Sequence, residues 1–122
     1  MSFFTWLYRK LFCPLLPRFI LEARTRSSEW RRVRQAHLEK EPVCQACGRN
    51  RELDVHHIVP VSFDPTKELD LGNLITLCSS PCHIVFGHLL NYQCYNKDVR
   101  NTVRVYRATY ENQRACLSRT PQ

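Results

Sequence analysis

Four cysteines of this chain are spaced so that they could hold one metal ion. Cys44 and Cys47 form a Cys-x-x-Cys pair, and 30 residues separate that pair from a second one, Cys78 and Cys82. Four thiolates in a tetrahedron are the usual shell of structural zinc, and paired cysteines at such spacings are typical of it. Disulfides or buried free thiols would be the other uses of these residues. Because disulfides belong to secreted chains and we find no secretion signal, we expect zinc.

The histidines near these cysteines indicate a second kind of chemistry. His56 and His57 are adjacent, so in an extended segment their side chains point to opposite faces. We therefore expect one imidazole to face a metal ion and the other a substrate water. His83 directly follows Cys82, so zinc bound at Cys82 would fix its position. A histidine of ordinary pKa, about 6.5, can take a proton from water near pH 7, which favours hydrolysis.

Three motifs in this region together resemble the HNH endonuclease family. They are VHHIVP at residues 55–60, LGNLITLC at residues 71–78 and the Cys82-His83 pair. The resemblance covers residues 28–107 and points to the subgroup with four zinc-binding cysteines. It implies an α+β fold, a small ββα-metal domain with flanking helices and a structural zinc.

The resemblance also implies roles for single residues. His57 would be the general base, and Asn73 would brace the loop that holds it. His56 and His83 would bind the catalytic divalent cation. The structural zinc would be held by the four cysteines: Cys44, Cys47, Cys78 and Cys82.

The chain departs from the family pattern at two positions. Three residues separate Cys78 from Cys82, where two is commoner, and His56 stands where many members carry aspartate. Neutral imidazole favours softer or borderline ions over magnesium. The catalytic cation could therefore be Mg²⁺, Mn²⁺, Ni²⁺ or Zn²⁺.

The charge distribution predicts a nucleic-acid partner. The 122 residues carry a formal net charge of +7, with +5 on residues 1–43, −2 on residues 44–94 and +4 on residues 95–122. Basic flanks could bind phosphates on either side of a scissile bond, although such arginines can also form solvated faces. The arginines that we expect to contact DNA are Arg31, Arg34, Arg100, Arg104 and Arg107.

The pattern of apolar and capping residues predicts three helices and a strand. The first helix runs from a serine cap at Ser27 or Ser28 to about Glu41, with Trp30, Val33 and a structural His37 on its buried face. A strand covers residues 53–59, a loop covers 60–72, and a second helix begins near residues 79–82. The last helix runs from Asn96 or Asp98 to about Cys116.

Two expectations depend on these helices being regular. His88 would lie about 140° around the helix from His83, so we do not expect the two to share a metal ion. Val99, Val103, Tyr106 and Tyr110 recur at helical spacing, and we expect this stripe to belong to the core rather than to a base-stacking surface.

The chain divides into three predicted parts. Residues 1–27 are an apolar and basic N-terminal segment, 28–116 the nuclease domain and 117–122 a C-terminal tail. The N-terminal segment is expected to pack on the domain or to mediate a homodimer or larger assembly, with binding to a membrane surface as the minor alternative. Its charge-free runs, such as Leu11 to Pro17, are too short to span a membrane. We expect a cytoplasmic protein.

These observations favour a metal-dependent DNA endonuclease that uses a histidine base and one catalytic cation. The main alternative is a DNA-binding module that is stabilised by zinc and does not cleave DNA. An RNA-cleaving nuclease is another alternative. Binding alone would not need His56, His57, Asn73 and His83.

Overall fold

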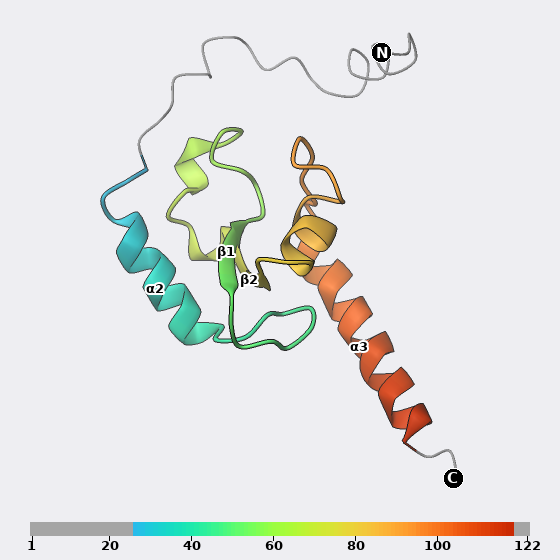
Figure 1. The fold of residues 1–122 in the computed structure, drawn as a ribbon. Helices are drawn as coiled ribbons and strands as arrows, with labels where there is room; N and C mark the ends of the chain where they lie inside the picture. Colours follow the sequence, from blue (N-terminus) through green and yellow to red (C-terminus); the bar gives the residue numbers. More distant parts are fainter. Residues whose placement is uncertain (1–25, 119–122) are drawn as a thin grey trace, which may run out of the picture.

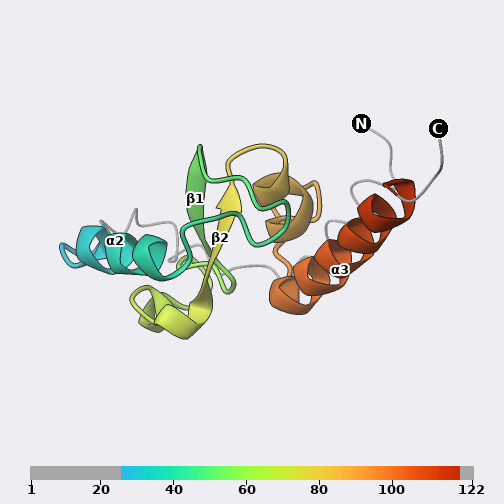
Figure 2. The same cartoon turned by 90° about the horizontal axis from the view of Figure 1, so that it is seen from below.

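The computed structural model describes residues 26–118, so the predicted N-terminal segment lies almost wholly outside the described residues. Helix α2 (Trp30–Lys40) precedes an antiparallel pair of strands, β1 (Leu53–His57) and β2 (Leu74–Cys78). The short helices η2 (Pro65–Lys67) and η3 (Leu71–Asn73) lie in the connection between the strands. After β2 come η4 (His83–Gly87) and the long helix α3 (Val99–Leu117). The fold is α+β, with α2 and α3 on opposite sides of the strand pair (Figures 1 and 2).

The two strands form the centre of the domain. They pair from Leu53 opposite Cys78 to His57 opposite Leu74. All five residues of β2 are buried, as expected for an apolar strand covered on both faces. The buried apolar cluster is small, and three of the four paired cysteines belong to it together with aliphatic residues: Ile58, Ile75, Leu77, Val99 and Val103. A core of this size needs an additional source of stability, such as a bound metal.

Helix α2 begins and ends close to the predicted residues. Its first residue, Trp30, donates its backbone N–H to the carbonyl of Ser27, and the Ser27 hydroxyl accepts from the backbone of Glu29. Glu29 rather than a serine occupies the capping position, and it makes no side-chain cap. The helix ends at Lys40, just before Pro42. His37 is its buried residue, which confirms the structural role predicted for it.

The side chain of Glu41 connects α2, β2 and α3. One of its oxygens lies 3.1 Å from Nε2 of His37 and accepts the backbone N–H of Thr76 at 3.2 Å. The other accepts from the guanidinium of Arg100 at 3.1 Å, and Arg100 also donates to the carbonyl of Leu74. Burial lowers the pKa of His37, so the imidazole is neutral near pH 7 and donates from Nε2. Arg100, which we predicted to contact DNA, thus has two partners within the fold.

Replacing Glu41 with alanine is expected to lower the free energy of unfolding by about 3 kcal/mol, because donors on three elements, two of them buried, would lose their acceptor. The matched control is Glu39→Ala, since Glu39 is exposed and bonds only to its helix neighbour Gln35. Urea denaturation of both metal-loaded variants measures the difference. Equal losses in the two variants would contradict the connecting role of Glu41.

The helix after β2 differs from the regular helix that we expected. Residues His83–Gly87 form a π-helix, in which hydrogen bonds join residues five apart rather than four. The expected angle of 140° between His83 and His88 is therefore wrong, because the wider turn returns His88 to the side of His83. Asn96 stabilises the end of η4, since its backbone N–H donates to Gly87 and its side chain to the carbonyl of Phe86.

Helix α3 is buried only over its first turns. Val99 and Val103 belong to the core as predicted, but Tyr106 and Tyr110 are 41% and 42% exposed. The prediction that the whole stripe is core is wrong, because α3 continues beyond the strands and η4 that cover its start (Figure 2). No helix within residues 26–118 has the length and apolar character needed to cross a membrane.

Candidate functional site

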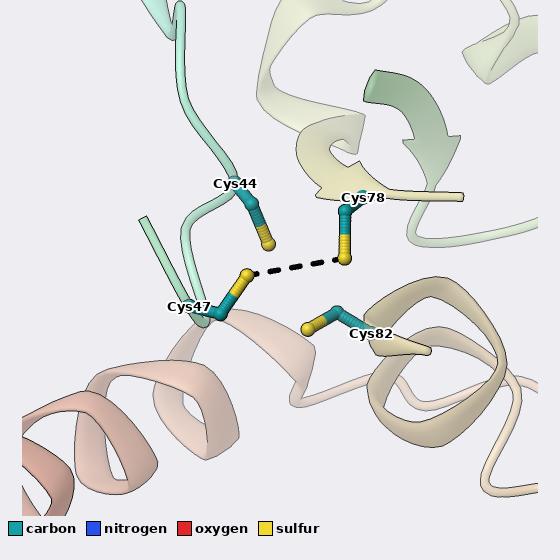
Figure 3. Close-up of side chains that lie close together, drawn as sticks. All are labelled: Cys44, Cys47, Cys78 and Cys82. Carbon is teal, nitrogen blue, oxygen red and sulfur yellow. Dashed lines mark hydrogen bonds between the residues drawn. The ribbon is translucent and has the colours of Figure 1, made fainter. Parts of the chain in front are cut away.

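The four paired cysteines converge at one end of the sheet. Cys44 and Cys47 lie in a turn after α2, Cys78 ends β2, and Cys82 immediately precedes η4 (Figure 3). The turn is closed by a hydrogen bond from the Gly48 N–H to the Cys44 carbonyl, and Gly48 has the positive φ of 77° that glycine adopts without cost. The longer gap before Cys82 does not separate the thiols.

The spacing of the four sulfurs fits a single metal ion. All four lie within 4.8 Å of one another, and the sulfurs of Cys47 and Cys78 are 3.9 Å apart. Tetrahedral zinc with bonds of about 2.3 Å to sulfur places its ligands about 3.8 Å apart. Burial raises the pKa of Cys82, and the hydrogen bond with Cys78 raises it further. Four thiolates packed together therefore need a cation to balance their charge.

A second cluster consists of three imidazoles. One nitrogen from each of His56, His83 and His88 lies within 4.8 Å of the others. His56 comes from β1, whereas His83 and His88 come from the start and the end of η4. The position of His88 in this cluster has no signal in the sequence, because only the π-helical turn brings it to the other two.

Gly87 allows the ring of His56 to reach this cluster. A β-carbon at position 87 would lie 2.9 Å from Cε1 of His56 and 3.0 Å from its Nε2, which is closer than real side chains approach. Any other residue would push the imidazole away from His83, whose Nε2 lies 3.0 Å from Nδ1 of His56.

The outer nitrogens of two of these imidazoles are already hydrogen-bonded. Nδ1 of His83 lies 3.3 Å from a carboxylate oxygen of Asp54, and Nδ1 of His88 donates to the carbonyl of Cys94 at 2.9 Å. Both rings thus turn an unprotonated Nε2 toward the cluster, which is how metal-binding histidines are usually oriented. Burial lowers the pKa of His56 to about 3, and the neighbouring imidazoles contribute to this. Three imidazoles form a donor set that suits a divalent cation.

Asp54 is expected to strengthen metal binding through His83. Replacing it with asparagine should weaken the binding of Ni²⁺ to the zinc-loaded protein by 10–100-fold, because the carboxylate orients His83 and adds negative charge. Isothermal titration calorimetry measures this affinity independently of any activity. Glu52→Gln is the matched control, since Glu52 is exposed and lies just before the same strand. An unchanged affinity in Asp54→Asn would mean that the 3.3 Å contact does not orient His83.

His57 faces the other side of β1, as the alternation of the strand predicts. Its ring stacks on Trp30 of α2 at a centroid distance of 4.5 Å, and its Nε2 lies 2.9 Å from the carbonyl oxygen of Glu68. A carbonyl can only accept, so Nε2 carries the proton and Nδ1 is free to accept one. Burial lowers the pKa of His57, and Arg26 also lowers it against the opposing effect of the Glu68 carbonyl. The neutral ring has the protonation state of a general base.

Asn73 ties together the two segments that hold His57. Its side-chain oxygen accepts from the backbone of Val59 at 2.8 Å, and its amide donates to the carbonyls of Val59 and Lys67. Val59 follows His57 by two residues, and Lys67 precedes Glu68, whose carbonyl orients the ring. Asn73 is itself buried, so this geometry fits the bracing role predicted for it.

His57 and the three-histidine cluster open into one cleft. The cleft has a volume of about 390 Å³, and residues 60–62 and Arg26 also line it. The guanidinium of Arg26 lies 4.8 Å from the centre of the Trp30 ring. Arg26 could not be predicted as part of the site. It is far from His57 in the chain, and no sequence pattern indicates that the two lie in one cleft.

None of the five arginines predicted to contact DNA lines this cleft. Four of them make hydrogen bonds within the fold, three of these to a carbonyl or a carboxylate: Arg34 to the carbonyl of Leu53, Arg100 to Glu41 and Arg107 to Glu111. Arg31 is exposed on α2, and Arg104 bonds to the neutral side chain of Asn101. Their contact with DNA stays a prediction.

Comparison with known proteins agrees with the family resemblance. Residues 44–84 match the family model described as HNH endonuclease. No curated protein and no solved structure matches the chain. The matched segment contains both cysteine pairs, His56, His57 and His83, and the four-cysteine cluster fits the zinc-binding subgroup of that family. Residues 44–84 are therefore an HNH domain, which implies a metal-dependent nuclease or nucleic-acid-binding function.

Proposed function

We propose that this HNH-domain chain is a metal-dependent DNA endonuclease that hydrolyses phosphodiester bonds. The observation that carries the proposal is the cleft in which His57 lies beside the cluster of His56, His83 and His88. These three histidines form a second set of metal-binding side chains, separate from the four cysteines and open to a cleft. A module that only binds DNA would have no use for such a set. The basic charge of the flanking segments supports a nucleic-acid substrate.

The four cysteines would hold structural zinc. Their thiols join the turn after α2 to the end of β2 and the start of η4. Zinc there would fix the distance between β1, which carries His56 and His57, and η4, which carries His83. Such short elements could not hold three catalytic side chains in register by apolar packing alone.

The three histidines would hold the catalytic cation. When bound, a divalent cation supplies positive charge that neutralises the scissile phosphate and the departing 3′ oxygen. His83 and His88 are oriented for this by Asp54 and by the Cys94 carbonyl. Among the expected cations, an all-imidazole donor set favours Ni²⁺ or Zn²⁺ over Mg²⁺ and Mn²⁺.

His57 would act as the general base. Its Nδ1 takes a proton from water, the water oxygen attacks phosphorus, and the bond from phosphorus to the 3′ oxygen breaks. The leaving oxygen takes a proton from solvent. The hydrogen bond to the Glu68 carbonyl keeps the proton of the neutral ring on Nε2, and Asn73 fixes both segments around the ring. Arg26 at the edge of the cleft is suited to pair with a phosphate oxygen.

The test is incubation of the zinc-loaded chain with supercoiled plasmid and a panel of divalent cations, with EDTA as the control. We expect nicked or linear products with at least one cation and none with EDTA. His83→Ala should keep its zinc and yet cut nothing. Binding without cutting under every ion would favour the non-cleaving module, and cutting of RNA alone would favour the RNA nuclease.

A further inference from the structure

Two exposed aromatic rings lie at the rim of the cleft. The side chains of Phe63 and Tyr92 are 48% and 70% exposed. Phe63 directly follows Ser62, which lines the cleft, and the ring of Tyr92 lies 4.8 Å from the ring of His88, which also lines it. Exposed rings beside a catalytic cleft are available to a substrate.

A cation lies near an aromatic ring at the cleft and another near the ring that packs on Phe63. The ring of Phe63 packs 5.6 Å from that of Tyr95, and the ammonium of Lys97 lies 5.8 Å from the Tyr95 ring. On the side of α2, the guanidinium of Arg26 lies over Trp30. Neither Arg26 nor Lys97 forms an ion pair with an acidic side chain in the described part of the chain. Both cations are therefore available to phosphates.

The loop that presents Tyr92 is held in place by backbone hydrogen bonds. Asn91 donates to the carbonyl of His88, Cys94 donates to that of Asn91, and the His88 ring donates to Cys94. Leu89 and Leu90 adopt positive φ values of 52° and 64°, which cost a non-glycine residue about 1–2 kcal/mol each. Backbone conformations with such an energetic cost cluster at functional sites. A loop that adopts one and leaves an aromatic ring exposed is more typical of a binding site than of a loop that only connects two helices.

We propose that this rim binds an unpaired DNA strand, with bases stacked on Phe63 and Tyr92 and phosphates held by Arg26 and Lys97. The inference rests on the proposed nuclease function and narrows its substrate to single-stranded DNA or the unpaired segments of branched DNA. In a duplex the faces of the bases are covered by their neighbours, so exposed rings have nothing to stack on. Surfaces that bind single strands combine aromatic rings with cations in this way.

The experiment measures DNA affinity without cutting. In the full-length, zinc-loaded chain carrying His57→Ala, fluorescence anisotropy compares a labelled 20-nucleotide single strand with a duplex of the same sequence. We expect the single strand to bind at least about 10-fold more tightly. Phe63→Leu or Tyr92→Leu should weaken that binding by about 5–100-fold, because each removes one stacked base. The affinity for duplex should change less than about threefold, since the stacked contact is absent there.

Two control variants test whether the rings act by stacking. Tyr92→Phe keeps the ring and should retain the affinity, and Tyr110→Leu removes an exposed ring of α3 that lies outside the cleft and should have no effect. Circular dichroism and zinc content check that each variant is folded. Equal affinity for both DNAs, or ring variants that weaken both equally or neither, would overturn the inference.

The proposed nuclease function can fail separately from this inference. If the chain cuts no DNA with any cation and still binds single strands through Phe63 and Tyr92, the proposed nuclease function would be wrong. The rim would remain a binding site for single strands. If the chain cuts duplex DNA and the ring variants have no effect, the nuclease function would stand and the inference of a single-strand binding rim would be overturned.

Discussion

Cys78→Ser is expected to release the zinc and unfold the domain. Cys78 ends β2 and is fully buried, and its sulfur lies 3.9 Å from that of Cys47. Structural zinc contributes about 10–16 kcal/mol to the folding of small zinc domains, whereas a whole domain is stable by only about 5–15 kcal/mol. Losing one of four thiolate ligands should therefore remove most of the stability. Elemental analysis measures the zinc, and far-ultraviolet circular dichroism measures the helices.

The matched control is Cys94→Ser. Cys94 is an exposed free thiol outside the cluster, and only its backbone takes part in hydrogen bonds. This variant should keep its zinc and its helices, which separates the loss of a metal ligand from the general effect of replacing a cysteine. If Cys78→Ser stayed folded and free of zinc, the domain would not depend on the four-cysteine cluster.

The central elements could be predicted because their residues carry strong local signals. The run of apolar and β-branched residues at 53–59 predicts a strand, in which the adjacent His56 and His57 point to opposite faces. Paired cysteines can converge only if the elements that carry them are neighbours, so their spacing also predicted which segments meet. The structure brings the four thiols together as expected.

The rest of the site depends on contacts that no local pattern contains. The π-helical turn that brings His88 to His56 also packs Gly87 closely against the His56 ring, whereas helical periodicity assumes a regular turn. The guanidinium of Arg26 lies over the Trp30 ring, and that ring stacks on His57. Arg26 therefore reaches the cleft through tertiary contacts. Likewise, Arg100 bonds to Glu41, 59 residues away, which the helix pattern alone does not show.

His57→Ala is expected to lower the rate of DNA cleavage by 10²–10⁴-fold, because it removes the proposed general base, which would take the proton from water. The folded structure should persist, since the zinc ligands and the core are untouched. The affinity for Ni²⁺ at the histidine cluster should also persist, because the ring of His57 stacks on Trp30 and is not one of the three imidazoles of that cluster.

His83→Ala provides the contrast that assigns the role of His57. It should lose both cleavage and the binding of Ni²⁺ measured by calorimetry, whereas His57→Ala should lose cleavage alone. Imidazole added to the His57→Ala reaction is expected to restore part of the rate, because it can occupy the space beside Trp30 and accept the proton that Nδ1 would take. Cleavage by His57→Ala at the rate of the unmodified chain would exclude His57 as the base. The search would then move to the other polar groups that line the cleft.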